Sequence, residues 1–534
     1  MNYAWLVPTA AGVPLAGALV LLILRRLPDP VAAALGALIG LATLGVAVAA
    51  TVIGDRNGFD RRPLQVDARW IPALGLRAHL GLDGVSAPLV LLTALLGTLV
   101  CVHLFRVRPA GGRGRQLVAC VLVVTGGAIA TFTALDLLLF FIAFETVLIP
   151  MWFVIAVWGD DRQPEPPPGR KRRSATEPGG EPARRDAANR FVLYTATGSA
   201  LMLLGIILVV LRTGTTDLTA LARSGGAGMS TSIQVTAAVL IVLGLAVKSP
   251  MWPFHTWLPP AHTIAPTAGS VLLAGVLLKM GTYGLIRVAV PVLPQGFTEL
   301  APYLGVFAVV GILWGGLACL VERDLKRLVA FSSVAHMGFV LLGVASMTST
   351  GLQGALYGNI AHGVVTALLF FVVGALKDRY HSADLGVLGS GLRDRLPRLG
   401  WLLTLGAVGG LGLPGLAIFW GELLSIAGAW QSDSLGGLGR PLAVLAAVGT
   451  VIAAAYWLRV LRVLWQGEPD STWVTPSPIA SAVLTDASTH ESITTAPLVL
   501  ATVALGLVPG PLLALTAPVV RLLLTAVPGG GVAP

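Results

Sequence analysis

Apolar runs alternate with short polar connections along the whole chain. Each run is about 18 to 25 residues long, which is enough for a helix to cross a hydrocarbon core of about 30 Å. Lipid offers no hydrogen-bond partners to the backbone, so such runs predict helices, which satisfy their own backbone groups. We therefore expect an all-α integral membrane protein with about 14 transmembrane helices.

The predicted transmembrane helices are spread over the whole chain, and their even number places both termini on the same side of the membrane. They cover residues 3–26, 31–54, 83–106, 115–135, 136–158, 190–211, 233–253, 267–290, 300–321, 328–347, 353–376, 399–425, 441–461 and 497–523.

Several connections are rich in arginine and lysine, namely residues 106–115, 169–185, 322–327 and 377–398. All of them fall on the side opposite to the termini. Since positively charged loops stay in the cytoplasm, we expect a multi-pass protein of the bacterial cytoplasmic membrane, with these loops inside and both termini outside. The stretch 159–189 is rich in Pro, Gly, Arg and Glu, which is typical of a disordered insertion.

Two of the predicted spans contain helix-breaking residues. Pro250 and Pro253 interrupt the seventh span, and Gly412, Pro414 and Gly415 interrupt the twelfth. Proline removes a backbone donor and clashes with the preceding turn, so these helices are expected to open locally. Two broken helices about five spans apart indicate two inverted five-helix repeats that meet at a transport path.

The predicted repeats divide the chain into four parts. Residues 1–114 hold helices 1–3, residues 115–290 form the first repeat with helices 4–8, and residues 300–461 form the second with helices 9–13. Residues 462–534 contain a polar connection and helix 14. Alternating apolar and polar residues within 55–82 indicate a short hairpin on the outer surface.

Composition supports a membrane protein and narrows its chemistry. Hydrophobic residues make up 55% of the chain and charged residues 12%, too few to cover a water-soluble protein of this length. The net charge of +10 comes largely from the basic connections and does not indicate nucleic-acid binding. The three cysteines lie apart and form no metal-binding motif, and the sequence has no phosphate-binding loop. We therefore expect no metal and no redox or nucleotide cofactor in this chain.

The choice between lysine and arginine is informative. The chain has 36 basic residues, of which only five are lysines: Lys171, Lys248, Lys279, Lys326 and Lys377. Lys248 and Lys279 lie within apolar spans, whereas most arginines lie in connections or at span ends. Arginine stays protonated in proteins, while a lysine removed from water can release its proton near neutral pH. This pattern favours proton transfer.

Six ionisable residues lie inside predicted spans, where a charge costs about 2.5–3.5 kcal/mol on insertion scales. They are Glu145, Lys248, Lys279, His336, His362 and Glu422. One such residue alone could simply hold two helices together by a hydrogen bond. Six residues of mixed charge in one apolar bundle favour a proton relay, with polar neighbours such as Thr282 and Asn359 able to hold water.

Other ionisable residues have simpler interpretations. Asp83, Asp136 and Glu322 lie at span edges, which favours a capping or solvated role. His255 and His262 follow the broken seventh span in what the sequence predicts to be a cytoplasmic loop. Either a gating role or a solvated position is possible for these two histidines.

Two stretches carry a resemblance to a known family. VKSPMWPFHTWLPPAHTIAPTAGSVLLAGVLLKMGTYGLIR at 247–287 and ERDLKRLVAFSSVAHMG at 322–338 resemble the antiporter-like membrane subunits of proton-pumping NADH:quinone oxidoreductase, respiratory complex I. The similarity extends over roughly residues 80–460, and the first stretch looks most like the subunit M branch. The long insertion near 159–189 departs from the family pattern.

The resemblance implies roles for the buried residues. Glu145 matches the family's fifth-helix glutamate, Lys248 its seventh-helix lysine, and Lys279 the eighth-helix lysine that links two half-channels. In the implied cycle, Glu145 holds Lys248 protonated until a signal from a neighbouring subunit weakens that pair. The proton then moves from Lys248 to Lys279.

The second half of the implied relay contains two histidines and an acid. His336 and His362 match positions where the family has ionisable or polar connectors, and Glu422 matches the twelfth-helix acid. The sister subunits L and N usually have lysine at that last position, so Glu422 favours the M branch. The proton would leave through these residues and bound water toward the outer side.

The resemblance also implies partners and rivals. Neighbouring antiporter-like subunits L and N are expected beside this chain, with NADH, flavin, iron–sulfur clusters and quinone held by other subunits. The same family includes subunits of multi-subunit sodium/proton antiporters and of membrane-bound hydrogenases, which remain alternatives. A membrane scaffold that assembles its neighbours without transport is a third possibility.

Overall fold

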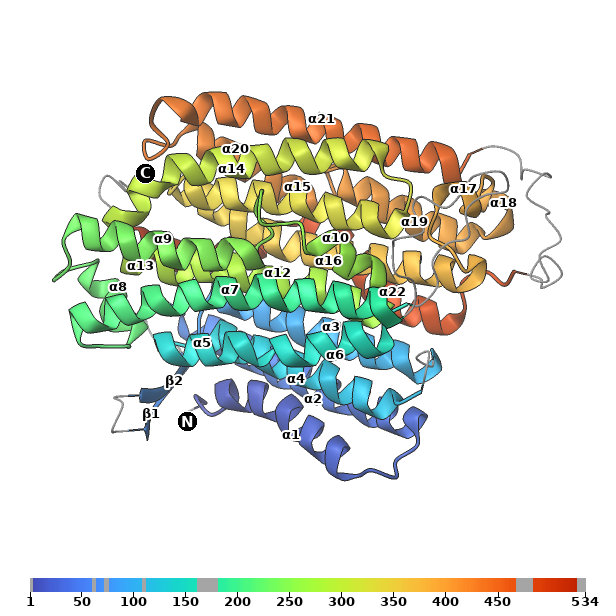
Figure 1. The fold of residues 1–534 in the computed structure, drawn as a ribbon, viewed down its shortest axis with the longest axis horizontal. Coiled ribbons are helices and arrows are strands. Elements are labelled where there is room, and N and C mark those ends of the chain that lie inside the picture. Colours follow the sequence, from blue (N-terminus) through green and yellow to red (C-terminus); the bar gives the residue numbers. More distant parts are fainter. Residues whose placement is uncertain are drawn as a thin grey trace.

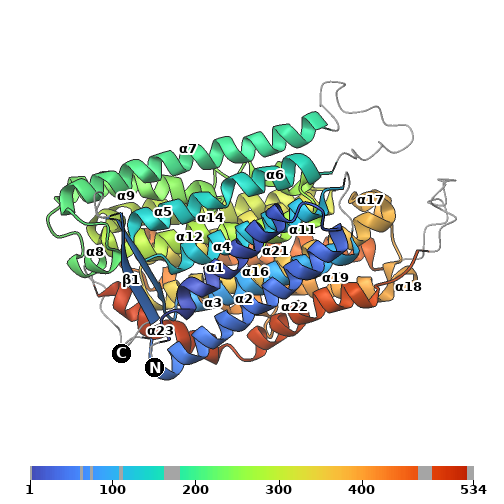
Figure 2. The same cartoon turned by 90° about the horizontal axis from the view of Figure 1, so that it is seen from below.

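A computed structural model describes residues 3–59, 64–71, 76–107, 112–160, 181–466 and 484–525. The helices lie side by side, with their long axes roughly aligned (Figure 1). Figure 2 shows α8 and the strand β1 at one end of this bundle and α17 and α18 at the other. The outer face of the bundle carries many exposed apolar side chains, as expected for a surface in contact with lipid.

The first part of the bundle contains ten helices. They are α1 (Leu6–Ile23), α2 (Asp29–Asn57), α3 (Ser86–Arg106), α4 (Gly114–Thr133), α5 (Leu137–Thr146), α6 (Leu148–Trp158), α7 (Glu181–Thr213), α8 (Leu218–Ser224), α9 (Thr231–Lys248) and α10 (Leu258–Ile264). The next span is a single helical rod with two wide turns of π-helix. It consists of α11 (Thr267–Leu272), the π-helix η2 (Leu273–Leu277), α12 (Leu278–Gly284), the π-helix η3 (Leu285–Ala289) and α13 (Val290–Val292).

The remaining helices complete the bundle. They are α14 (Pro294–Val321), α15 (Leu325–Ala345), α16 (Ser349–Tyr380), α17 (Leu385–Leu388), α18 (Leu392–Arg395), α19 (Pro397–Gly410), α20 (Ala417–Trp430), the short 3₁₀ helix η4 (Gly436–Leu438), α21 (Gly439–Leu464), α22 (Thr489–Leu507) and α23 (Gly510–Leu524).

Thirteen helices in the described part of the chain are long and apolar enough to cross a membrane. The broken pair α19 and α20 is not among these thirteen, because each half is short. Each of the other predicted spans corresponds to one of the thirteen. The chain is thus a helical multi-pass membrane protein, as the hydrophobic pattern predicts.

The predicted insertion 159–189 extends too far. Residues 161–180 lie outside the described part of the chain, but α7 already begins at Glu181. Its polar first turns carry ion pairs one helical turn apart, Glu181 with Arg185 at 2.5 Å and Asp186 with Arg190 at 2.8 Å. The hydrophobic pattern predicts only the apolar part of a helix, so it does not indicate polar turns that extend beyond the membrane.

The predicted last span, 497–523, is wrong as a single helix. α22 already begins at Thr489, within the predicted polar connection, and the chain breaks at Pro509 before α23. Ser488 and Glu491 form a capping box, in which each side chain accepts a hydrogen bond from the other residue's backbone. That S-x-x-E signal is present in the sequence and marks the helix start. Residues 467–483 of the connection lie outside the described residues.

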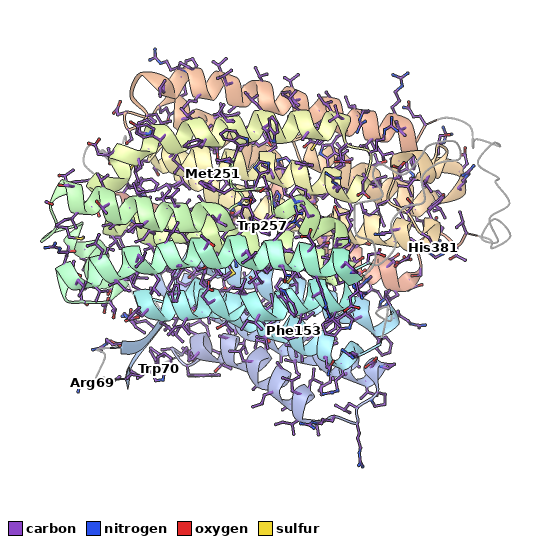
Figure 3. The ribbon with its side chains drawn as sticks, in the orientation of Figure 1. Arg69, Trp70, Phe153, Met251, Trp257 and His381 are labelled. Atoms are coloured by element: carbon purple, nitrogen blue, oxygen red, sulfur yellow. The ribbon has the colours of Figure 1, made fainter. Side chains whose placement is uncertain are left out.

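Both predicted helix breaks are present. α9 ends at Lys248, before Pro250 and Pro253, and the chain resumes as α10. Figure 3 places Met251 and Trp257 of this break midway along the bundle, far from either end. Trp257 Nε1 donates a hydrogen bond to the Val247 carbonyl at 3.0 Å, so a side chain satisfies one of the carbonyls that the end of α9 frees.

The second break separates α19 from α20. Gly412 and Gly415 adopt φ values of +75° and +92°, a region that favours glycine. α20 then packs tightly on α16, since a methyl group added at Gly421 would lie 2.6 Å from the Gly358 Cα atom. Small residues that let two helix backbones approach in this way are common in membrane bundles.

The predicted hairpin is also present. Strands β1 (Leu64–Ile71) and β2 (Leu76–Leu82) pair antiparallel, with Leu64 opposite Leu82. Leu80 forms a bridge with Ala134, which fixes β2 to the chain just before α5. Within the described residues this hairpin forms the only sheet, so the helical fold class stands with one small addition.

The two halves of the chain share one local arrangement. Beside the Asp136–Asp217 bridge, Leu137 N donates to Thr216 O at 2.8 Å and Leu218 N donates to Leu135 O at 2.9 Å. Beside the Asp324–Asp384 bridge, Leu325 N donates to Ala383 O and Leu385 N to Arg323 O at the same two distances. In both halves the aspartates cap the helices that follow, which are α5 and α8 in one and α15 and α17 in the other. Figure 2 shows α8 and α17 at opposite ends of the bundle.

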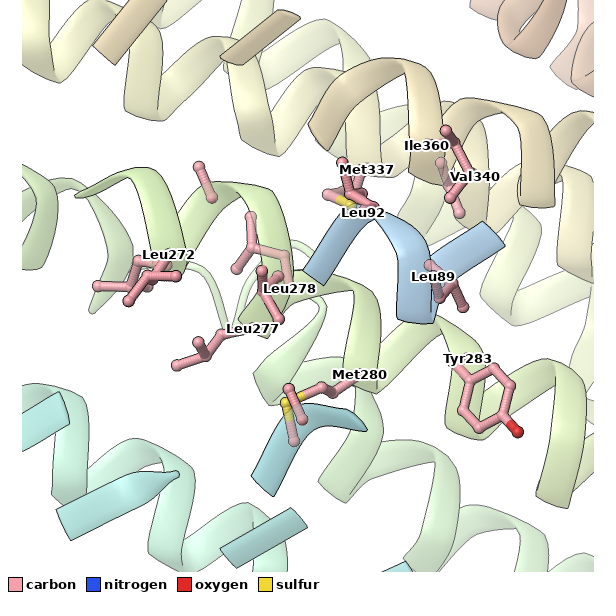
Figure 4. Packing of buried hydrophobic residues seen from close by; sticks show 14 of the residues in the cluster. Leu89, Leu92, Leu272, Leu277, Leu278, Met280, Tyr283, Met337, Val340 and Ile360 are labelled. Atoms are coloured by element: carbon pink, nitrogen blue, oxygen red, sulfur yellow. The ribbon is translucent and has the colours of Figure 1, made fainter. Parts of the chain in front are cut away.

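The centre of the bundle is formed by α15, α16 and the span from α11 to α13, which are buried along almost their whole length. Leu92 of α3, Leu278 of α12, Met337 of α15 and Ile360 of α16 are among the buried side chains shown in Figure 4. Polar groups within this apolar centre have no access to bulk water and must find partners in the protein or in bound water.

Candidate functional site

The wide π-helical turn η2 lies directly before Lys279 on α12. The Lys279 side chain is fully buried, and its ammonium donates a hydrogen bond to the carbonyl of Ala274, which belongs to this turn. Short π-helical turns are rare and frequently occur at functional sites. Here the turn provides a carbonyl that holds a lysine in the apolar centre of the bundle.

Lys279 also contacts a histidine on another central helix. Its Nζ atom lies 2.6 Å from Nδ1 of His362 on α16. A hydrogen bond needs one donor and one acceptor, so a charged Lys279 requires the neutral His362 tautomer with its proton on Nε2. Nearby, Thr282 on α12 donates to the side-chain oxygen of Asn359 on α16 at 2.8 Å, which joins the same two helices.

The line of ionisable groups continues through a second histidine to an acid. The rings of His362 and His336 are 5.7 Å apart between centroids, in an edge-to-face arrangement. His336 on α15 then places Nδ1 3.1 Å from Oε1 of Glu422 on α20. All four side chains from Lys279 to Glu422 are buried. We call Lys279, His362, His336 and Glu422 the central line.

The broken helix positions the last member of the central line. A methyl group added at Gly412 would lie 2.8 Å from Glu422 Oε2, so the break between α19 and α20 lies directly against the carboxylate. Thr450 of α21 donates to the same oxygen at 3.3 Å. Glu422 therefore lies beside backbone that has no regular helical hydrogen bonding, as is common at transport sites in broken helices.

Glu145 and Lys248 lie in a separate group. Ser199 of α7 donates a hydrogen bond to Glu145 Oε1. Lys248 is buried at the end of α9, and its ammonium lies 4.9 Å from the ring centre of Phe144 and 5.8 Å from that of Phe191. The Glu145 and Lys248 charges interact electrostatically, but the two residues form no direct ion pair. Phe144, the neighbour of Glu145, contacts the ammonium in its place.

The six predicted residues thus form two groups. The four residues of the central line contact one another in sequence, whereas Glu145 and Lys248 interact without a direct contact. The two groups are brought together by the packing of the end of α9 against α12. A methyl group added at Gly281 of α12 would lie 2.3 Å from Ser249 Oγ, so the residue after Lys248 lies against the helix that carries Lys279. Within the described residues, Lys248 Nζ has no hydrogen-bond partner, so water is needed to link it to the central line.

Other polar side chains on the helices of the central line donate to backbone carbonyls. Ser332 and Ser333 both donate to the Val329 carbonyl, and Thr366 donates to the carbonyl of His362. Tyr283 donates to the Phe132 carbonyl at 2.7 Å. Thr282 with Asn359 is the pair that links two helices beside the central line.

The structure also shows buried ionisable residues whose contacts or positions the sequence does not predict. Arg287 and Asp83 form a buried ion pair at 2.6 Å, although Asp83 had the simpler interpretation of a helix cap, which it also provides for Val85 and Ser86. His255 and His262 are both buried, so neither is a solvated loop residue. The apolar run ends at the proline break, so a sequence reading places both histidines outside the bundle.

The central line has the chemical groups that proton transfer requires. Lysine, histidine and glutamate can each gain and lose a proton, and each member lies next to another member that can do the same. Within the described residues, no cluster of three or more His, Cys, Asp or Glu side chains has the arrangement of a metal site. The arrangement is suited to moving protons between fixed groups.

Comparisons with known proteins identify similar chains. A family model described as "NADH:quinone oxidoreductase/Mrp antiporter, TM" matches residues 177–452. NADH-quinone oxidoreductase subunit M of Rickettsia typhi is 34% identical over 450 residues, which cover 83% of this chain and 82% of the relative. A chain of respiratory complex I from Thermus thermophilus with bound NADH has a TM-score of 0.82 and 27% identity, covering 98% of this chain and 100% of its own. A chain of the Mrp complex from Dietzia sp. shares the fold at a TM-score of 0.80 and 24% identity, with 98% of both chains covered.

Proposed function

Since the chain belongs to the antiporter-like subunit M family of NADH:quinone oxidoreductase, we propose that its central line and the Glu145–Lys248 group carry protons across the membrane. As a member of this family it is a multi-pass membrane-arm subunit of a redox-driven proton translocase. The proposal concerns the path of the protons within this chain.

The contact between Lys279 and His362 supports the proposal most strongly. At 2.6 Å the two nitrogen atoms share one hydrogen bond, so the pair carries at most one positive charge. Arrival of a second proton forces one to leave toward His336. His336 in turn contacts Glu422, whose carboxylate takes up the proton, becomes the neutral acid and then releases the proton beside the broken helix. The step needs no bond change other than proton exchange.

Glu145 and Lys248 are proposed to control entry. The two charges interact across Phe144, so a change in the position or protonation of Glu145 alters the energy of the charged lysine. When that stabilisation is weakened, Lys248 releases its proton through water toward Lys279. Ser249, the residue after Lys248, lies against Gly281, which is two residues after Lys279.

We also propose that residues 115–290 and 300–461 are two inverted repeats. The matching backbone bridges at Asp136–Asp217 and Asp324–Asp384 support this assignment, because the same hydrogen bonds recur in both halves. Their neighbouring helices α8 and α17 lie at opposite ends of the bundle, as expected if one half is inverted relative to the other (Figure 2).

The orientation and the partners are further parts of the proposal. The positive-inside bias supports a cytoplasmic location for the basic end with α17 and α18, and an outer location for the end with the hairpin. Wide exposed apolar faces on α2, α7 and α21 fit lipid and neighbouring membrane subunits, for which L and N are the proposed candidates. NADH, flavin, iron–sulfur clusters and quinone are then handled by other subunits of the complex.

The sodium/proton antiporter alternative rests on the Mrp likeness, which at 24% identity shows the fold alone. Identity to the subunit M relative is higher, at 34% over most of both chains. Purifying the chain from its native membrane distinguishes the two, because flavin and iron–sulfur subunits accompany only the redox-driven complex.

The entry part of the proposal is tested by Lys248→Arg and Glu145→Gln in the assembled complex. Arginine keeps the charge but cannot release its proton, so proton pumping per electron should fall. Glu322→Gln is the matched control, because Glu322 is an acid at a helix end, paired with Arg327 at 3.3 Å. Normal pumping by both test variants would refute the assigned roles and leave the scaffold alternative.

A further inference from the structure

His262 is a buried histidine that the proposed relay does not use. It lies on α10, is 0% exposed, and neither of its ring nitrogens has a hydrogen-bond partner within the described residues. Its ring stacks on Phe370 of α16, with centroids 4.6 Å apart and planes 9° from parallel. A buried polar ring with two unsatisfied nitrogens is costly unless water or another group completes it.

The end of α10 is the meeting point of charged groups from three other segments. Asp160, which follows α6, donates its backbone N–H to the Ile264 carbonyl at 2.7 Å. Lys326 at the start of α15 is buried, and its ammonium donates a hydrogen bond to the carbonyl of Ala265, the residue after Ile264. Lys377 at the end of α16 forms an ion pair with the Asp160 carboxylate at 2.5 Å.

This cluster reaches water at its outer edge. The side chains of Lys377 and Asp160 are 17% and 27% exposed, whereas Lys326 is buried behind them. α17 and α18, which follow α16, lie at the same end of the bundle (Figure 1). Protons therefore have access to the cluster from the side that carries the basic connections.

On its other side, His262 interacts electrostatically with members of the central line. It interacts with the charges of both Lys326 and Lys279, and His362 interacts with His262 in turn. Phe370 and His362 lie eight residues apart on α16, which corresponds to about 12 Å along a helix axis. The unsatisfied nitrogens of His262 offer hydrogen-bond partners to water that would bridge this span.

We propose that His262 is a proton-carrying residue that connects the cluster of Lys326, Lys377 and Asp160 to the Lys279–His362 pair. One ring nitrogen accepts a proton from water beside Lys326, and the other releases its proton to water toward His362. After each transfer the ring is neutral with its proton on the nitrogen that faces Lys326, and rotation of the ring restores the starting arrangement, with no other bond made or broken. The route enters the central line without passing through Lys248, and it rests on the proposed function of that line.

A purely structural role for His262 predicts a different behaviour. If the ring serves only to stack on Phe370, another aromatic ring of similar shape preserves it. His262→Phe keeps the stacking surface but cannot carry a proton, and His262→Gln keeps polarity without carrying one. The two variants therefore separate proton transfer from packing.

His103 provides a matched control. It is a buried histidine on α3 whose ring contacts Phe371, the neighbour of Phe370, with centroids 5.3 Å apart. Its electrostatic neighbours in the described part of the chain are His490 and Glu491, and neither belongs to the central line. His103→Phe makes the same substitution as His262→Phe, but at a histidine that contacts Phe371 and not Phe370.

The experiment measures NADH-driven proton uptake and NADH oxidation in inverted membrane vesicles that contain the assembled complex. His262→Phe and His262→Gln should slow proton delivery through this route by about 10²-fold or more, with loss of the corresponding pumping, while His103→Phe pumps normally. Wild-type pumping by His262→Phe, or an equal loss in His103→Phe, would overturn the proposal. If the Phe variant does not assemble, His262→Gln decides in the same way.

Lys279→Met in the same vesicles separates this inference from the proposed function. Lost pumping in Lys279→Met with normal pumping in both His262 variants rejects the role of His262 and leaves the central line intact. Normal pumping in Lys279→Met rejects the central line itself, and the role of His262 with it.

Discussion

Lys279 Nζ lies 2.6 Å from His362 Nδ1, although the two residues are 83 positions apart in the sequence. Neither side chain has access to bulk solvent, and the second nitrogen of His362 has no partner within the described residues. Two adjacent cations at this distance would repel strongly in an apolar centre and would lack an acceptor for the hydrogen bond. The pair can therefore hold at most one excess proton, which is the property that the proposed single-step transfer requires.

Lys279→Arg should abolish proton transfer through the central line while the complex still assembles. Arginine keeps the positive charge but does not release its proton, so the transfer step should slow by about 10²-fold or more. NADH-driven acidification of inverted vesicles measures the loss. Retention of wild-type pumping by this variant would show that Lys279 acts only as a fixed charge.

Glu422→Gln should lower pumping strongly, because an amide can still accept a hydrogen bond from His336 but cannot take up a proton. Thr450→Val is the matched control, since it removes only the 3.3 Å hydrogen bond to the same carboxylate. That bond is worth about 1 kcal/mol, so its loss should alter the rate by less than about tenfold. Equal effects of the two changes would argue against proton transfer by Glu422.

Gly412→Ala should lower both stability and pumping. An added methyl group at this site would lie 2.8 Å from Glu422 Oε2, and the φ of +75° disfavours alanine by about 1–2 kcal/mol. Gly415→Ala is the control, because its φ is also positive but its nearest neighbour is Leu507 at 3.7 Å. Thermal unfolding of the purified complex should shift for both, and pumping should fall only for Gly412→Ala. Equal pumping by the two variants would contradict the role of the break in positioning Glu422.

The Asp83–Arg287 pair should make the fold sensitive to acid. Burial raises the pKa of the Asp83 carboxyl, but the Arg287 charge and the backbone N–H groups of Ser86 and Val85 outweigh it and hold the pKa below its ordinary value. The pair therefore stabilises the fold above the ordinary carboxyl pKa, and this contribution is lost as the pH falls through the lowered value.

Asp83→Asn should remove that stabilisation at neutral pH by about 3–5 kcal/mol, because it leaves the Arg287 charge buried and unpaired. Asp67→Asn breaks a far more exposed ion pair with Arg77 on the hairpin and should have a much smaller effect. The midpoint of thermal unfolding, recorded against pH, checks both. An Asp83→Asn variant as stable as wild type would contradict the assigned role.

The sequence predicted the parts of the fold that depend on local chemistry. Long apolar runs marked the spans, and Pro250, Pro253 and the glycines Gly412 and Gly415 marked the two breaks, because backbone conformation at these residues is set locally. The hydrophobic pattern does not predict the start of α7 at Glu181, because this first part of the helix is stabilised by ion pairs and lies in a polar segment.

The candidate site was predictable in its members but not in its contacts. A charge in an apolar span is costly, so the cost itself marks Lys279, His336 and Glu422. The pairing of Lys279 with His362 depends on how α12 packs against α16, which no local pattern contains. The sequence predicts a loop at His262 because the apolar run ends at Pro253, whereas the chain folds back into the bundle as α10.

Proton pumping per electron in vesicles that contain the His362→Gln variant tests the central claim most directly. His362 contacts Lys279 on one side and His336 on the other, and glutamine can replace its hydrogen bonds but cannot carry a proton. We predict that the complex assembles and that the protons moved through this subunit are lost from the ratio. A wild-type ratio of protons to electrons in this variant would contradict the proposed path.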